Sequence, residues 1–221
     1  MPTKPKSKSF GWLFWLVTVV IIIALAGLTA PMVIRCPKKP DQTEATSNLR
    51  QIGLALFEFE AEYGSYPSEE TAKLVKEKHP TDINLSGSSS NALFRQLFAA
   101  KITQSEQLFY AKNSGTKKPD GEITVGKLLE KGEVGFGYIA GLSTKDNPAR
   151  PIAFAPIIPG TTKFDPKPFD GKAVILRIDN SVTSLNIDEN GNAVSGGQNI
   201  LSPEHPVWGE SVTNLDIRYP E

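Results

Sequence analysis

Two histidines and one Ser-x-x-Lys stretch are the residues whose types could support catalysis. His79 and His205 are each followed by proline, 126 residues apart, and neither has a second histidine at metal-ligand spacing. Ser114-Gly115-Thr116-Lys117 has the spacing of serine acyl enzymes, but the companion SDN and KTG elements are absent. The HExxH, CxxC, GxSxG and phosphate-loop patterns are absent too. The sequence therefore predicts no catalytic residue and no enzymatic activity.

Three polar residues near the C-terminus have the spacing of oxygen ligands. Asp188, Asn190 and Asn192 alternate as at the start of a calcium-binding loop, although Ala193 occupies the place of the loop glycine. Asn190-Gly191 is also a common hairpin turn, which explains the same residues without a metal. These three residues are weak calcium candidates, and no other metal or cofactor is predicted.

The elements that must position any site begin with an uncharged N-terminal stretch. Residues 10–34 hold 25 consecutive positions without a charge, between the flanking basic residues Lys4, Lys6, Lys8, Arg35, Lys38 and Lys39. A helix of this length spans roughly 37 Å, more than the roughly 30 Å hydrocarbon layer of a bilayer. The stretch is longer than the apolar region of a signal peptide, so an uncleaved transmembrane anchor is predicted. Short basic N-termini usually stay in the cytoplasm, which places the C-terminal domain outside it.

The charge distribution separates this N-terminal region from the rest of the chain. The chain has 24 basic and 24 acidic residues, but residues 1–40 hold six basic residues and no acid. The remainder therefore has 18 basic and 24 acidic residues, near −6 in formal charge. Nucleic-acid binding is disfavoured, because it normally needs a basic stripe. The single cysteine, Cys36, excludes an internal disulfide and has no assigned role.

Beyond the anchor, the pattern changes from helical to extended. Apolar residues at steps of three and four predict a helix over 43–63, and shorter helices are expected over 69–78 and 91–100. Residues 113–121 are polar and are expected to form an exposed loop. Short strands are expected over 135–140, 151–157, 173–178 and 181–187, the last two joined by a two-residue turn at Asp179-Asn180. The predicted fold class is α+β, with an N-terminal transmembrane helix and an amphipathic helix packed on a small antiparallel β-sheet.

Several of these segments together resemble bacterial type IV pilins and the pseudopilins of type II secretion systems. The resemblance rests on the apolar N-terminal helix and on the segments 48–56 (NLRQIGLAL), 63–67 (YGSYP), 136–142 (FGYIAGL), 176–182 (LRIDNSV) and 196–201 (GGQNIL). It implies a pilin-like domain and a glycine cleaved by the prepilin peptidase, for which Gly11, followed by Trp12, is the candidate. The family has a glutamate at the fifth place of the mature chain, where this sequence has Leu16.

These observations predict four segments. They are a basic cytoplasmic tail (1–9), a transmembrane anchor (10–34), a Pro/Lys linker (35–42) and an extracytoplasmic pilin-like α+β domain (43–221), in a single-pass protein of the bacterial inner membrane. The expected partners are membrane lipid and other pilin-like or secretion-system proteins.

Three functions are open at this stage. The first is a membrane-anchored pseudopilin-like structural or interaction protein of a type II secretion or type IV pilus-like assembly. Its small residues Ala24, Ala26, Gly27 and Ala30 either pack helix against helix or merely face lipid. The second is a membrane-tethered binding domain that does not polymerise, and the third is a tethered hydrolase, whose site the sequence does not display.

Overall fold

The computed structural model describes residues 10–34, 40–209 and 212–221, and within the first range it describes the side chains of residues 11–25. The chain divides into two compact units, residues 1–38 and 39–221. The predicted basic tail (1–9) and most of the predicted linker (35–39), including Cys36, lie outside the described residues.

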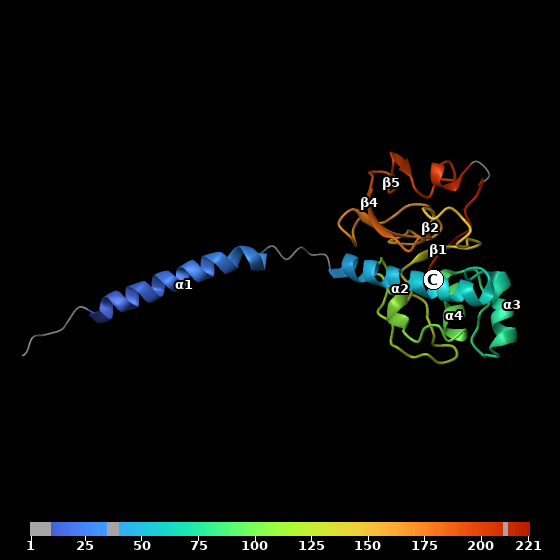
Figure 1. Cartoon of the computed structure of the whole chain (residues 1–221), viewed down its shortest axis with the longest axis horizontal. Helices are drawn as coiled ribbons and strands as arrows, with labels where there is room; N and C mark the ends of the chain where they lie inside the picture. Colours follow the sequence, from blue (N-terminus) through green and yellow to red (C-terminus); the bar gives the residue numbers. More distant parts are fainter. Residues whose placement is uncertain (1–9, 35–39, 210–211) are drawn as a thin grey trace, which may run out of the picture. The chain divides into compact units, whose positions relative to one another are not determined.

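The first unit contains a single described helix, α1 (Phe10–Ile34), which covers the uncharged stretch (Figure 1). In the described part of the chain, no helix combines the length and apolar character needed to cross a membrane. This finding contradicts the predicted transmembrane anchor over 10–34 and the predicted single-pass inner-membrane localisation.

In the second unit, α2 (Pro40–Tyr63) is the long amphipathic helix that the sequence predicts. It begins three residues before the predicted start, because proline fits the first turn of a helix, where its missing N–H is not needed. Leu49, Ile52, Leu56 and Phe59 recur at steps of three and four and are fully buried. Gly64, with φ of +82°, ends the helix, and its N–H donates to the carbonyl of Glu60 at 2.7 Å.

Two shorter helices follow, close to their predicted bounds. They are α3 (Glu69–Lys78) and α4 (Ser90–Ala99). The Ser68 hydroxyl accepts from the N–H of Thr71, whose hydroxyl in turn accepts from the N–H of Ser68, so the start of α3 is capped reciprocally. Ser89 caps α4 through the N–H of Ala92. Two one-turn 3₁₀ helices follow later in the chain: η1 (Glu106–Phe109) comes directly after α4, and η2 (Pro206–Trp208) comes near the C-terminus.

The described strands form one antiparallel sheet of seven strands in the order β6-β5-β4-β3-β2-β1-β7, curled into a half-barrel. Their bounds are β1 (Gly137–Ile139), β2 (Pro151–Ala155), β3 (Lys172–Arg177), β4 (Val182–Ile187), β5 (Ala193–Ser195), β6 (Gln198–Asn199) and β7 (Ile217–Arg218). The β2–β3 register shifts between Pro151 and Ala153, and such an irregularity bends a strand and increases its twist. The predicted pilin-like fold with a small sheet is therefore wrong, because the sheet is larger and curled.

The β3–β4 hairpin also differs from its prediction by one residue. Arg177 N–H donates to the carbonyl of Ser181, and Asn180 N–H donates to the carbonyl of Arg177, which leaves a three-residue loop at 178–180. Asn180 has φ of +62°, the left-handed conformation that such a loop requires at its last residue. Asparagine tolerates this conformation, so it takes the place usually given to glycine.

The core of the second unit lies on both sides of α2. In Figure 1, α2 runs between the sheet and α4, and its contacts include β3 and α4. On the sheet side, the helix backbone approaches β3 so closely that a Cβ on Gly53 would lie 3.2 Å from Leu176 Cδ1. On the other side, α2 contacts α4 and η1, whose rings Phe94 and Phe109 pack with their centroids 4.9 Å apart. α2 is thus buried on two sides, which fixes the sheet and the helices relative to each other.

Candidate functional site

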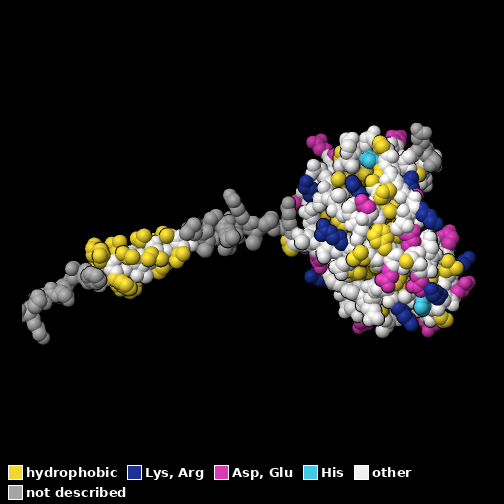
Figure 2. All heavy atoms as spheres, viewed as in Figure 1, with side chains coloured by type: hydrophobic (Ala, Val, Ile, Leu, Met, Phe, Trp, Pro, Cys, Tyr) yellow, Lys and Arg dark blue, Asp and Glu magenta, His cyan; other side chains and the backbone are white. Residues whose placement is uncertain are grey.

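The described surface of α1 is apolar around its whole circumference. Its large side chains from Trp12 to Leu25 are each 44–72% exposed (Figure 2). The one hydroxyl among them is satisfied locally, since Thr18 Oγ1 donates to the carbonyl of Phe14 at 2.9 Å. Water solvates such a surface poorly, and exposed apolar surface of this extent marks an interaction site.

Gly11, the predicted processing residue, lies in the first turn of α1. A Cβ there would meet no atom within 4 Å, so no packing in the described structure requires glycine at this place. Its processing stays a prediction. The side chains of Ala26, Gly27 and Ala30 lie outside the described residues.

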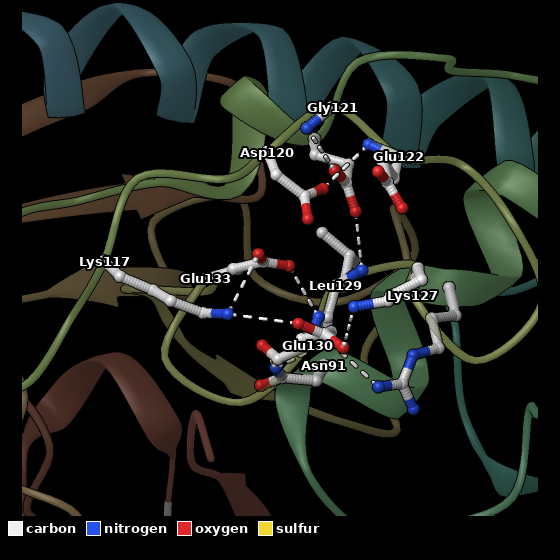
Figure 3. A network of polar contacts seen from close by, with 11 residues as sticks. Asn91, Lys117, Asp120, Gly121, Glu122, Lys127, Leu129, Glu130 and Glu133 are labelled. Carbon is white, nitrogen blue, oxygen red and sulfur yellow. Dashed lines mark hydrogen bonds and ion pairs between the residues drawn. The ribbon is translucent and has the colours of Figure 1, made fainter.

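A second feature is a cluster of three carboxylates in the segment before β1. Asp120, Glu130 and Glu133 each bring an oxygen within 4.8 Å of the other two (Figure 3). Asp120 is exposed and Glu130 is partly exposed, whereas the Glu133 side chain is only 1% exposed. Like charges this close repel, so the cluster needs positive charge beside it.

Two lysines supply that charge. Lys117 Nζ lies 3.1 Å from Glu130 Oε2 and 3.3 Å from Glu133 Oε1, and Lys127 Nζ lies 3.4 Å from Glu130 Oε1. The hydrogen bond from Lys117 is the largest cause that lowers the pKa of Glu130 and, reciprocally, raises the pKa of Lys117. All three carboxylates also touch the backbone or the lysines of the same segment, which therefore folds around them.

The backbone around the cluster is held by buried polar side chains. Glu133 Oε2 accepts from the N–H of Glu130 at 2.7 Å. From α4, Asn91 Nδ2 donates to the carbonyls of Leu129 and Glu130, both at 3.1 Å, and Arg95 Nε donates to the carbonyl of Leu128 at 2.9 Å. These contacts fix the turn that carries Glu130 and Glu133 to a helix of the core.

Glu106, on η1, supports the same segment from below the surface. Its side chain accepts from the N–H of Gly121 at 3.0 Å and from the N–H of Leu129 at 2.7 Å, and the residue is 1% exposed. Burial is the largest cause that raises the pKa of this carboxyl, and the nearby charge of Glu133 raises it further. Glu106 thus ties the two arms of the loop that carries Asp120.

The weak calcium candidates lie elsewhere, in the β4–β5 turn. Asp188 Oδ1 accepts from the N–H groups of Asn190 and Asn192 at 2.9 and 2.8 Å, and Oδ2 accepts from Asn192 Nδ2 at 3.0 Å. The hydrogen bond from the Asn192 backbone is the largest cause that lowers the pKa of Asp188. The carboxylate is therefore engaged in closing the turn, and calcium binding by Asp188, Asn190 and Asn192 stays a prediction.

The residues singled out for catalysis have separate partners. His79 Nε2 lies 3.3 Å from Glu62 Oε1, and His205 Nε2 lies 3.1 Å from the carbonyl of Ser195. Lys117 contacts Glu130 and Glu133, and no contact with Ser114 is found in the described structure. None of these pairs places a base beside a nucleophile.

Sequence reasoning missed the carboxylate cluster altogether. Asp120 falls at the end of a stretch predicted to be an exposed loop, and Glu130 and Glu133 lie 10 and 13 residues further on. Nothing in their spacing marks a ligand set, because the loop between them brings them together. Four acids within a glycine-containing segment, Asp120, Glu122, Glu130 and Glu133, are the only sequence signal, and it is a weak one.

Comparisons with family models, with curated proteins and with solved structures each gave no match.

Proposed function

We propose that this chain is a non-enzymatic structural protein that assembles with further copies of itself through α1, while the domain of residues 40–221 makes contacts with other proteins. The proposal keeps the assembly role predicted from the sequence, although the domain does not have the predicted pilin-like fold. The observation that carries it is the exposure of every large apolar side chain described on α1.

The distribution of these side chains supports an assembly of more than two copies. Successive residues of a helix lie about 100° apart, so Ile21, Ile22 and Ile23 point in three directions, and they are 51, 59 and 65% exposed. One neighbouring helix covers a single stripe, whereas a helix that is apolar all round needs apolar surroundings on every side. Several neighbouring copies of α1 would provide them.

The hydrophobic core of the second unit also supports the proposal. Its buried hydrophobic core is formed by residues between Ala45 and Trp208, with no contribution from the described residues of α1. The domain can therefore keep its fold while α1 associates. Burial of each large apolar side chain contributes about 1.5–3 kcal/mol, which gives a helix of this composition a strong driving force for association.

Sedimentation velocity of the full chain over a range of concentrations tests this function. Ile22→Glu should shift the chain toward the monomer, because it would bury a charge between helices. Leu54→Glu, on α2, is a matched control, since Leu54 and Ile22 are both 59% exposed, and it should leave assembly unchanged.

A monomeric wild-type chain at every concentration would contradict the proposal and favour a binding domain that does not polymerise. The absence of a carboxylate at Leu16 is the observation that favours this second function. Flotation of the chain with lipid vesicles, with no association between copies, would also contradict self-assembly.

A further inference from the structure

We infer that Asp120, Glu130 and Glu133 form a binding site for a calcium ion, in competition with the ammonium group of Lys117. Calcium prefers carboxylate oxygens, and the three oxygens lie within 4.8 Å of one another. Ligands on opposite sides of a calcium ion are about 4.8 Å apart, given a bond length of about 2.4 Å. The three oxygens are therefore close enough together to bind one calcium ion.

The state of Glu133 is the independent observation that points to a ligand. Its side chain is 1% exposed, and its Oε1 atom accepts no hydrogen bond in the described structure. Lys117 Nζ lies 3.3 Å from this oxygen, but its hydrogen bond goes to Glu130 Oε2 at 3.1 Å. This buried oxygen therefore has only an ion pair with an exposed ammonium, and a directly bound cation would satisfy it at shorter range.

The two lysines do not balance the negative charge of the three carboxylates, and a divalent ion would balance it better. Asp120, Glu130 and Glu133 carry three negative charges, and Lys117 and Lys127 supply two positive ones. The Lys117 side chain is 52% exposed, so its ammonium can turn toward water. A calcium ion in its place, with Lys127 retained, would bring the sum of charges to zero.

The surroundings make this a preformed site. Glu133 is held through Oε2 by the N–H of Glu130, and the turn between them is fastened to Asn91 on α4. Asp120 lies across the loop from that turn (Figure 3). The buried Glu106 joins the two arms of the loop. Calcium would therefore join Asp120 to an already ordered turn. This site is distinct from the turn of Asp188, whose carboxylate is engaged by its own backbone.

Calorimetric titration of the purified full chain with calcium chloride, with magnesium chloride as a comparison, tests the inference. We expect one calcium ion per chain, with weaker magnesium binding, and about tenfold or greater loss of affinity in Asp120→Asn and Glu130→Gln, since each removes a ligand charge. Lys117→Met should tighten binding, because it removes the competing ammonium; a purely structural lysine would not have this effect. Asp188→Asn is the control and should leave calcium affinity unchanged.

Three results would overturn the inference. They are no calcium binding by Lys117→Met at about 10 mM calcium, about tenfold above the Kd of the weakest protein sites; unchanged affinity in both Asp120→Asn and Glu130→Gln; or loss of binding in Asp188→Asn alone. Native circular dichroism spectra of the variants would show that any loss of binding does not come from unfolding.

Discussion

Gly135 is the residue at which the structure predicts the sharpest loss of stability, because two backbone segments meet there without room for a side chain. A Cβ on Gly135 would lie 2.1 Å from the carbonyl oxygen of Ala111 and 2.6 Å from its nitrogen. An ordinary contact begins at 3.4 Å, so Gly135→Ala must push the segments apart by about 1.3 Å. This movement would also strain the hydrogen bond from Gly135 N–H to the carbonyl of Phe109, now 2.9 Å long.

The cost can be estimated from these two effects. Overpacking costs about 1–3 kcal/mol, and a weakened hydrogen bond costs about 0.5–1.5 kcal/mol, so the free energy of unfolding should fall by about 2–4 kcal/mol. For a domain of this size, each kcal/mol lowers Tm by about 2–4 °C, and a loss of roughly 5–15 °C is expected.

Urea unfolding followed by near-UV circular dichroism measures this loss. Gly141→Ala serves as the control, since a Cβ there meets nothing within 4 Å and only its φ of +78° opposes the change. The control should cost about 1 kcal/mol. If Gly135→Ala unfolds within about 0.5 kcal/mol of the wild type, the close approach of the two segments is refuted.

Two further changes test the second unit. Burial raises the pKa of Glu106 above its usual value of 4.5, so the folded chain holds this proton more tightly than the unfolded chain. The stability that it contributes is therefore present at low pH and is lost as pH rises from 4.5 through the raised pKa. In urea unfolding between about pH 4 and 8, the free energy of unfolding of Glu106→Gln minus that of the wild type should increase with pH. A difference that does not change with pH would refute the effect of burial on this pKa. At the helix–hairpin contact, a Cβ on Gly53 would lie 2.0 Å from Asn180 Oδ1, so Gly53→Ala should cost about 1–3 kcal/mol. Asn180→Gly should recover part of that cost in a double-mutant cycle of unfolding free energies, and strict additivity would contradict the contact.

The helices of the second unit were predictable, because their signals are local. The apolar spacing of α2 and the serine cap of α3 appear directly in the sequence and place both helices within a few residues of their observed bounds. The β3–β4 hairpin was predicted one residue too short, because Asp179 and Asn180 both tolerate turn conformations and the sequence does not say which one has positive φ.

The extent of the sheet and the carboxylate cluster depend on contacts between distant residues. β5, β6 and β7 have only three, two and two residues, too few for an alternating pattern, and they exist because neighbouring strands pair with them. In the same way, nothing in the sequence indicates that Glu133 is buried while Asp120 is exposed. The anchor prediction is wrong for a different reason, since no helix in the described part of the chain combines the length and the apolar character that a membrane span needs.

Cysteine cross-linking along α1 is the measurement that tests the proposed assembly most directly. In a Cys36→Ser background, Ile21→Cys, Ile22→Cys and Ile23→Cys place single thiols at consecutive positions about 100° apart around the helix. If copies of α1 surround one another, oxidation should give disulfide-linked dimers from all three variants. Cross-links at one position only, or at none, would contradict an assembly in which α1 is covered on every side.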